Sequence, residues 1–522
     1  MLFTSYSFIG FILLLVPVYY LIPKKRQWIL LLLASCFFYC TFDPSYLIYV
    51  ALTAVTVWGC ALMMSRDQRI ESEYLKERKE DLSKEVQKAY KAQHKKIRAI
   101  WMILGIVINL GILVLVKYYS FFTGIFTGQQ TGIKGLAVPL GISFYTLQAL
   151  GYLIDVKRGT VEAERNPLKM LLFISFFPQV VQGPISRFKD LSETLFIEHD
   201  FDWKGFSYGF QRVLWGFFKK LIIADRIAPV VNAVVSDVSK YRGAYITAVL
   251  ALYSLELYAD FTGGIDVTIG VAQMLEIRVT ENFDQPYFST SLKEYWRRWH
   301  ITMSQWFREF VFYPVSTSKP IQGISKLIRK KLGNKGKKIP VYLSSFIVWL
   351  LTGLWHGASW TFIVWGLLNW FILMVAEELE PVLAKFHDKY HFFSTNWYTA
   401  VTWVRTLLLI AVLNLFDCYA TVGEVFSALW SVLSTANIKV WFNGDLAKLG
   451  MSGLDYIVIL LGAALMFTVS WLQIIKGSVR EFIAEKPYPV RFAVWFILFI
   501  IVLLVGAYGI GYDASQFIYN RF

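Results

Sequence analysis

Long apolar runs constrain the fold of this chain more than any other feature. A helix of about 20 apolar residues crosses the roughly 30 Å hydrocarbon core of a bilayer. Runs of this kind lie at residues 4–22, 27–42, 45–64, 99–117, 397–415, 452–475 and 488–510. Together with a hydrophobic content of 56% over 522 residues, they predict an all-α polytopic membrane protein.

Other apolar segments are interrupted by glycine, proline or charged residues. They lie near residues 138–155, 168–185, 204–235, 243–275 and 341–375. A bilayer tolerates irregular backbone only where protein or a water-filled cavity surrounds it, so we interpret these segments as re-entrant or tilted pieces. No internal repeat and no linker rich in proline, glycine or serine is evident, and we expect residues 1–522 to form a single membrane domain.

Basic clusters set the expected topology. Much of the net charge of +15 lies in residues 65–98, 318–338 and 476–491, and a further cluster, KKR at 24–26, follows the first apolar run. The positive-inside rule places these segments in the cytoplasm and the N-terminus outside. Because residues 65–98 alternate acidic and basic side chains at helical spacing, we expect a charged cytoplasmic helical hairpin arm there.

The basic segments have two open interpretations. They serve topology and contact with anionic membrane lipids, or the segment 318–338 attracts a phosphorylated, anionic donor. A nucleic-acid partner is not expected, because the basic residues alternate with membrane helices and form no soluble binding platform.

Cysteine and histidine spacing does not indicate a metal site. The four cysteines lie in or beside apolar runs, which is typical of packing residues. His387 and His391 are four residues apart, but no third ligand is evident, and a zinc site needs at least three protein ligands. We therefore predict no metal and no permanently bound cofactor.

One histidine lies inside an apolar run. His356 occurs in LTGLWHGASW, between SSFIVWL and TFIVWGLLNW, and so in the middle of a membrane-length helix. An ionisable group at membrane depth is a candidate functional site. The alternative is a histidine that only forms a hydrogen bond with a neighbouring helix.

A second histidine lies in the run SLKEYWRRWHITMSQWFREFVFYPV, residues 291–315. This run begins with a capping-box pattern and has no helix breaker before Pro314, so it predicts one continuous helix. His300, Ser304 and Arg308 follow at four-residue steps and would share a face of that helix. A helix lying at the membrane interface explains the mixture of arginine and tryptophan, but it leaves His300 unexplained.

Six blocks of sequence resemble a known family. They are PLGISFYTLQALGYLIDVKRG (139–159), FFPQVVQGPISR (176–187), GFFKKLIIADR (216–226), LELYADFTGGIDVTIG (255–270), EYWRRWHITMSQWFREFVFYPV (294–315) and GLWHGASWTFIVWG (353–366). In this order they resemble the membrane-bound O-acyltransferases, MBOAT, in the bacterial branch of alginate O-acetylation membrane subunits and their cell-wall relatives. The resemblance runs from about residue 135 to the C-terminus, and it implies a catalytic core over residues 135–375.

The resemblance implies a bowl of roughly 11 or more transmembrane helices with re-entrant segments around a central tunnel. In that tunnel a cytoplasmic acyl thioester, taken to be acetyl-CoA, meets an acceptor from the outer face. His356 corresponds to the catalytic histidine of the family's WHG block, and His300 to its companion in the RRWH block. Multi-pass insertion in the bacterial inner or plasma membrane follows from the same resemblance.

The chemistry of these side chains agrees with such a role. A thioester carbonyl is already electrophilic, so the enzyme mainly needs a base that deprotonates the incoming hydroxyl and a tunnel that aligns both substrates. Desolvation keeps an imidazole neutral, so His356 can accept a proton near neutral pH, while Trp355 and Trp360 exclude water. Three roles are open for His300, which are to orient His356, to polarise the thioester carbonyl or to line the vestibule. Two roles are open for Asp260, which are to bind an imidazole or to cap a broken helix.

Besides the two histidines, we expect six residues to line the substrate tunnel. They are Trp355, Trp299, Trp296, Arg297, Ser304 and Asp260.

The C-terminal residues end in FIYNRF. We expect residues 507–522 to form an extracytoplasmic tail, and its Phe-x-Tyr-x-x-Phe pattern resembles an acyl-carrying terminus in these export systems. The hypothesis is that Tyr519 receives the acyl group and presents it to an extracytoplasmic SGNH-type acetyltransferase partner. The alternative is a tail whose aromatic rings anchor it at the interface.

Three other functions are compatible with a polytopic membrane protein. D-alanyl transfer to teichoic acid belongs to a similar branch of the same family. A polysaccharide transporter would show paired, similarly interrupted halves and acidic residues for coupling ions, which are not evident. A non-catalytic scaffold would tolerate the loss of His356.

Overall fold

The computed structural model describes residues 1–128 and 138–507, and within them the regular secondary structure is helical, with no strand. Seven helices or joined helices are long and apolar enough to cross a membrane. They are Tyr46–Glu77, Lys84–Thr127, Gly336–His356, Trp360–His387, Asn396–Cys418, Gly453–Lys476 and Tyr488–Val505. Shorter apolar helices, Tyr6–Leu21 and Val422–Ser434, accompany them. The prediction of an all-α polytopic membrane protein is therefore confirmed, whereas the tunnel and the number of crossings stay predictions.

The chain forms two compact units. The first contains residues 1–209 and 271–280, and the second contains residues 210–270 and the residues from 281 onward. The chain passes between the units at three points, one in α10 (Trp203–Phe217), one in α12 (Ala244–Met274) and one between residues 280 and 281.

The first unit is built from nine α-helices that precede α10. They are α1 (Tyr6–Leu21), α2 (Gln27–Cys40), α3 (Tyr46–Glu77), α4 (Lys84–Leu113), α5 (Tyr119–Thr127), α6 (Ile142–Arg158), α7 (Pro167–Ser175), α8 (Phe177–Val180) and α9 (Phe188–Leu195). A π-helical segment, η2 (Val114–Tyr118), joins α4 to α5.

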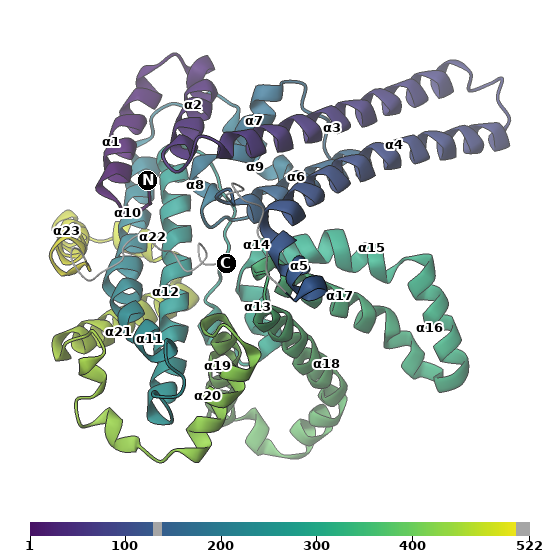
Figure 1. Cartoon of the computed structure of the whole chain (residues 1–522). Helices are drawn as coiled ribbons and strands as arrows, with labels where there is room; N and C mark the ends of the chain where they lie inside the picture. Colours follow the sequence, from purple (N-terminus) through teal and green to yellow (C-terminus); the bar gives the residue numbers. More distant parts are fainter. Residues whose placement is uncertain (129–137, 508–522) are drawn as a thin grey trace. The chain divides into compact units, whose positions relative to one another are not determined.

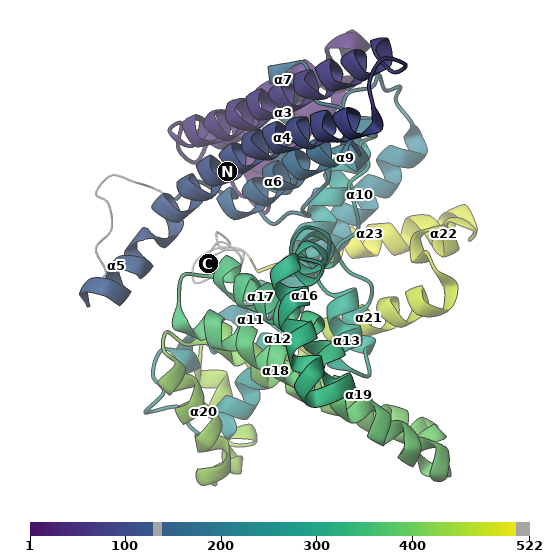
Figure 2. The same ribbon diagram turned by 90° about the vertical axis from the view of Figure 1, so that its right-hand side faces the viewer.

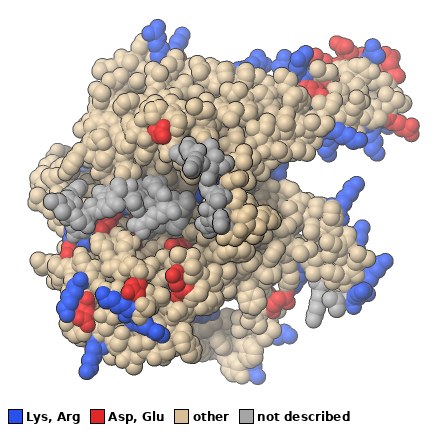
Figure 3. Space-filling view, in the orientation of Figure 1, with Lys and Arg blue, Asp and Glu red and all other residues tan. Residues whose placement is uncertain are grey.

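The charged segment predicted as an arm lies at the distal end of a helical hairpin. Figure 1 and Figure 2 show α3 and α4 side by side along their length, and Figure 3 shows acidic and basic side chains gathered at the far end of the hairpin. Inside it, His94 Nδ1 lies 2.7 Å from Asp67 Oδ1, and Arg98 donates to Glu71 over 2.5 Å. These long-range pairs hold the two helices together where the sequence has few apolar residues.

The block at 139–159 forms α6, whose side chains are nearly all buried. Gly141 precedes it with φ +73°, and a Cβ atom there would lie 2.2 Å from the carbonyl oxygen of Val180. Only glycine allows both this conformation and this approach. At the other end of α6, Asp155 binds the guanidinium of Arg187 at 2.7 Å. The blocks at 139–159 and 176–187 are therefore packed against one another.

The second unit contains the rest of α10, most of α12 and the helices that follow. The α-helices are α11 (Asp225–Val235), α13 (Leu292–Arg298), α14 (Ile301–Phe307), α15 (Tyr313–Ser316), α16 (Lys319–Leu332), α17 (Ile339–His356), α18 (Trp360–Lys389), α19 (Asn396–Cys418), α20 (Val422–Ser434), α21 (Gly453–Lys476), α22 (Val479–Ala484) and α23 (Tyr488–Val505). Two π-helical segments, η3 (Phe218–Ala224) and η5 (Arg308–Phe312), continue α10 and α14.

Residues 341–375 do not form one interrupted piece. They contain nearly all of α17 and the first half of α18, two span-length helices that pack along each other, and the tilt of these helices stays a prediction. His356 is the last residue of α17 and not the middle of a membrane-length helix. The sequence pattern could not separate these cases, because apolar residues continue without interruption on both sides of a turn of only three residues, 357–359.

A buried ion cluster fixes the middle of α12. Lys220 Nζ, on η3, lies 2.5 Å from Asp260 Oδ1 on α12 and 2.7 Å from Asp225 Oδ1 at the start of α11. All three side chains are buried. A buried cation between two carboxylates connects three successive elements, because each charge would be costly in the interior without the others.

Candidate active site

The backbone at His300 differs from the predicted continuous helix over 291–315. The first part is α13, which ends at Arg298, and α14 begins only at Ile301. Between them His300 adopts φ +48° and ψ +50°, a left-handed conformation that costs a non-glycine residue about 1–2 kcal/mol. Ser304 and Arg308 therefore do not continue a helical face that begins at His300.

The side chain of Asn282 holds this break in place. Asn282 Oδ1 accepts hydrogen bonds from Thr302 N at 3.1 Å and from Thr302 Oγ1 at 2.9 Å. Its backbone carbonyl accepts from Ile301 N at 2.9 Å. A residue 18 positions before His300 thus compensates the cost of the left-handed conformation, and no pattern within residues 291–315 could reveal it.

The same side chain determines which nitrogen of His300 carries the proton. The amide atom that faces Thr302 N must be the oxygen, because a backbone N–H only donates. His300 Nδ1 lies 3.3 Å from that oxygen, so Nδ1 is the donor in this pair. In the neutral ring the lone pair then resides on Nε2.

His300 is fully buried between aromatic rings. Its ring lies 5.0 Å from that of Phe261 and 5.7 Å from that of Trp355, both edge to face. His300 lies outside the seven candidate membrane spans. Burial lowers the pKa of its imidazole well below the ordinary range, and the nearby ring of His356 lowers it further. His300 is therefore neutral at physiological pH.

His356 lies at the end of α17 and is half-buried. Its ring centre is 5.1 Å from that of Trp355 and 4.9 Å from that of Trp365. Since the ring of Trp355 contacts both histidines, it forms part of one wall that they share.

The glycine after His356 allows α17 and α18 to approach closely. Gly357 is extended at φ −168°, and a Cβ atom there would lie 2.4 Å from the ring of Phe362. Ser359 then caps α18, because its side chain accepts a hydrogen bond from the backbone N–H of Phe362. The WHGAS stretch is therefore a tight connection between two helices, and it places His356 against the first turns of α18.

The tryptophans predicted to line a tunnel form a packed aromatic wall. Trp299 is buried and stacks on Tyr295, with ring centres 5.4 Å apart. Trp296 donates from Nε1 to Asn369 Oδ1 at 3.0 Å and lies 5.5 Å from the ring of Trp365. The wall thus joins α13, which carries Trp296, to α18, which carries Asn369 and Trp365.

The other predicted residues lie in different surroundings. Ser304 donates to the carbonyl oxygen of Trp296 at 3.3 Å, whereas the side chain of Arg297 is 71% exposed. Asp260 forms the ion pair with Lys220 described above. Tyr519 lies outside the described residues. Among the residues that the structure describes, no group of three or more metal-ligating side chains of the kind that could hold an ion is found.

Three residues of the site were not predicted from the sequence. Trp360, which was predicted to exclude water, is 56% exposed, whereas Trp365 is buried and its ring lies against His356. Asn282 and Asn369 were not identified, since single asparagines carry no periodic signal and their partners are distant in sequence. These residues complete a pair of histidines packed against tryptophan rings in a polytopic membrane protein.

Comparison with known proteins assigns this chain to a family. Residues 160–417 match the family described as MBOAT, membrane-bound O-acyltransferase family. The chain is 30% identical over 491 residues to a probable alginate O-acetylase of Pseudomonas fluorescens, covering 93% of this chain and 84% of that protein. It is 33% identical over 375 residues to a probable alginate O-acetylase of Azotobacter vinelandii, covering 70% of this chain and 66% of that protein.

A third relative is named for peptidoglycan and not for alginate. The chain is 30% identical over 331 residues to a peptidoglycan O-acetyltransferase of Helicobacter pylori, covering 58% of this chain and 59% of that protein. The chain therefore belongs to the MBOAT family and is a membrane-bound acyltransferase. The resemblance predicted from the six sequence blocks is confirmed.

Proposed function

We propose that this protein takes an acyl group, acetyl in the first instance, from a cytoplasmic thioester and passes it across the membrane for O-acetylation of an extracellular or cell-wall polysaccharide. The observation that carries the proposal is the pair of histidines, one fully buried with a defined tautomer and one half-buried, on a shared tryptophan wall. The names of the relatives, which mention alginate and peptidoglycan, support polysaccharide O-acetylation as the purpose of the transfer.

In the proposed reaction His356 is the general base. It accepts the proton of the attacking hydroxyl, the hydroxyl oxygen forms a bond with the acyl carbon, and the carbon–sulfur bond breaks. The leaving thiolate then takes the proton from the imidazolium, so the histidine is regenerated. General-base catalysis contributes about 10²–10⁴-fold, and the rings of Trp355 and Trp365 keep water from competing with the hydroxyl.

The tautomer inferred for His300 supports one of its possible roles. Polarising the thioester carbonyl would require an N–H group at Nε2, whereas the contact of Nδ1 with Asn282 Oδ1 favours a proton on Nδ1. We therefore assign His300 Nε2 as a hydrogen-bond acceptor that orients the imidazole of His356. A buried, neutral acceptor suits this role, because it fixes the partner ring without adding a charge.

Tyr519 is the proposed acyl relay. The phenol oxygen attacks the thioester, forms a phenyl ester and releases the thiol, and the ester carbonyl is then attacked by a nucleophile of an extracytoplasmic SGNH-type partner, which releases the phenol. A phenol serves both steps, since it is acidic enough to be deprotonated by a buried base and is a good leaving group. Acetyl-CoA is the proposed donor, and the bacterial inner membrane is the proposed location.

The test is transfer of labelled acetyl from acetyl-CoA to protein purified in lipid nanodiscs. His356→Gln is expected to lower labelling at least roughly 100-fold, while His387→Gln, which changes an exposed histidine outside the site, leaves it unchanged. Full labelling of His356→Gln would overturn the proposed chemistry. An equal or higher rate with a D-alanyl thioester would assign the protein to D-alanyl transfer instead.

The relay is tested separately by mass spectrometry of the C-terminal peptide. We expect acetyl on Tyr519 in the wild type, none in Tyr519→Phe, and unchanged labelling in Tyr512→Phe, which removes a neighbouring phenol outside the FIYNRF pattern. Acetyl transfer to the partner by Tyr519→Phe at the wild-type rate would exclude the relay while leaving the histidine chemistry in place.

A further inference from the structure

The residue that holds the break at His300 belongs to a segment without regular secondary structure. Asn282 lies in the segment 281–285, ENFDQ, between α12 and the 3₁₀-helix η4 (Pro286–Phe288). Such a segment has no ladder of hydrogen bonds of its own, so its conformation depends on the elements that bind it. The residues that bind this segment are therefore candidates for further control of the site.

Backbone hydrogen bonds join one side of the segment to the break at His300. The carbonyl oxygen of Asn282 accepts from Ile301 N at 2.9 Å, and Asp284 N donates to the carbonyl oxygen of Arg298 at 2.9 Å. These two bonds lie on either side of His300 in the sequence. A displacement of the segment therefore changes the backbone at the histidine.

The ring of Phe283 makes the same connection through side chains. It lies 4.9 Å from the ring of Trp299 and 4.9 Å from that of Phe261, both edge to face. The ring of Phe261 in turn packs against His300. The segment thus contacts the surroundings of His300 through both its backbone and its central side chain.

An arginine of α10 binds the first residue of the segment. Arg212 Nη1 donates to Glu281 Oε1 and Arg212 Nη2 to Glu281 Oε2, each over 2.5 Å. Two parallel bonds between a guanidinium and a carboxylate fix the orientation of the partner as well as its distance. The side chain of Glu281 is 58% exposed, so solvent screens the charges and the matched geometry is what makes the contact specific.

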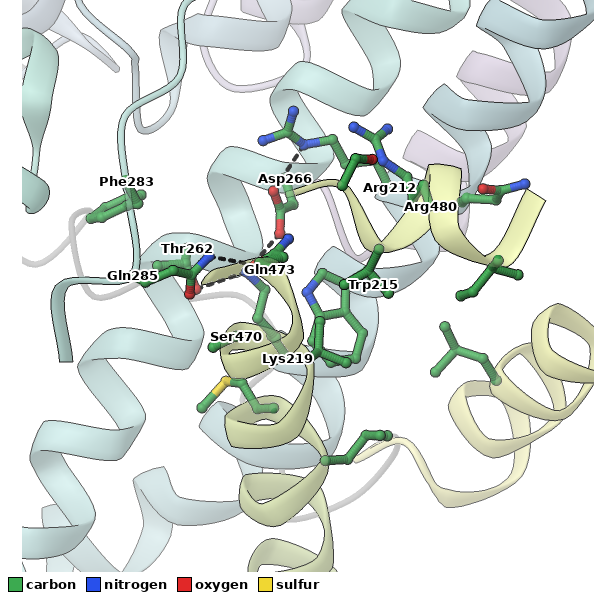
Figure 4. Close-up of a pocket in the computed structure, with 18 of the residues that line it drawn as sticks. Arg212, Trp215, Lys219, Thr262, Asp266, Phe283, Gln285, Ser470, Gln473 and Arg480 are labelled. Carbon is green, nitrogen blue, oxygen red and sulfur yellow. Dashed lines mark hydrogen bonds and ion pairs between the residues drawn. The ribbon is translucent and has the colours of Figure 1, made fainter. Parts of the chain in front are cut away.

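The guanidinium of Arg212 is itself held in place. Its Nε donates to Asp266 Oδ1 at 2.9 Å, and Lys219 Nζ lies 2.6 Å from Asp266 Oδ2 and donates to Thr262 Oγ1 at 2.8 Å. Figure 4 shows Asp266 between Arg212 and Lys219 on the wall of a pocket of about 720 Å³. The three charged side chains are at most 14% exposed, and each compensates the burial of its neighbour.

We propose that Arg212 is a positioning residue for the site and acts through Glu281 on Asn282. The guanidinium, fixed by Asp266, holds Glu281, and the adjacent Asn282 is thereby placed to bind the backbone and the imidazole of His300. The consequence for the rate of acyl transfer rests on the proposed function, whereas the placement of Asn282 does not.

Hydrogen exchange tests the placement without any measurement of activity. In Glu281→Gln, which weakens the contact with α10, we expect the amide protons of Ile301 and Thr302 to exchange about tenfold faster in lipid nanodiscs. Glu378→Gln is the matched control, because it removes the charge of a similarly exposed glutamate of the second unit, which binds Lys338 at 2.8 Å. Exchange in Glu281→Gln that equals the control would overturn the proposal.

Acetyl transfer tests the consequence for the rate. Arg212→Lys keeps the positive charge, but one ammonium group cannot bind Asp266 and both oxygens of Glu281 together. We expect kcat to fall about tenfold at unchanged KM, because the substituted residue contacts no substrate. Arg226→Lys makes the same change in an arginine of the second unit that binds Asp455, and it should leave kcat unchanged. A higher KM at unchanged kcat would contradict a positioning role.

A double variant shows whether the effect passes through Asn282. In the Asn282→Ala background, Glu281→Gln should lower kcat no further, because the group that it positions is already absent. Losses that multiply in the double variant would refute the route through Asn282. If the wild type transfers no acetyl group, the proposed function fails, and hydrogen exchange at Ile301 and Thr302 still decides the placement.

Discussion

The most informative perturbation is the replacement of Asn282, which touches the proposed chemistry only through His300. In Asn282→Ala the bonds to Thr302 N, Thr302 Oγ1 and His300 Nδ1 are all lost. The buried backbone N–H of Thr302 loses this acceptor, at a cost of about 1–3 kcal/mol, and the left-handed conformation at His300 loses its support, worth about 1–2 kcal/mol. The two costs add to about 2–5 kcal/mol on the competent arrangement, which predicts a transfer at least roughly 30-fold slower.

The conservative variant Asn282→Asp separates positioning from folding. A carboxylate keeps the acceptor for Thr302 and His300, so we expect the fold to be retained. Its negative charge stabilises the imidazolium and raises the pKa of His300, which burial holds low in the wild type. The proposed activity requires a neutral His300. As the pH falls, Asn282→Asp is therefore expected to lose activity at a higher pH than the wild type does.

The assay is label transfer from acetyl-CoA across a range of pH, with thermal unfolding measured on the same nanodisc samples. Asn414→Ala is the matched control, because it removes another buried asparagine of the second unit, whose side chain bonds Ser254 and not the site. Wild-type rates in Asn282→Ala, or a pH profile of Asn282→Asp that coincides with the wild type, would refute the assignment of Asn282 as a positioning residue.

Two further predictions concern stability. Gly357→Ala adds a methyl group 2.4 Å from the ring of Phe362, and this overpacking is expected to lower the stability of the protein by about 1–3 kcal/mol. The loss should be measurable as a lower melting temperature and slower acyl transfer. An unchanged melting temperature would contradict the packing of the turn between α17 and α18. Lys220→Met leaves Asp260 and Asp225 buried without their cation and is expected to lower the stability of the protein by about 3–5 kcal/mol. The double variant Lys220→Met/Asp260→Asn should recover part of this loss. A double variant less stable than Lys220→Met would argue against a buried ion pair.

The sequence by itself determined the class of protein and most of the candidate site. Apolar runs of membrane length identify spanning helices because the bilayer imposes length and composition locally, residue by residue. His356 stood out as an ionisable ring in an apolar segment, and the family resemblance of the WHG and RRWH blocks pointed to His356 and His300 together.

Only the tertiary structure decided how these residues are arranged. The break at His300 is held by Asn282, and Asp260 is paired with Lys220. The ring of Trp365 packs against His356, whereas Trp360 is exposed. In each case a hydrogen bond, ion pair or packing contact between different structural elements outweighs a local preference by a few kcal/mol. Such pairings leave no period in the sequence, so they become visible only when distant segments are brought together.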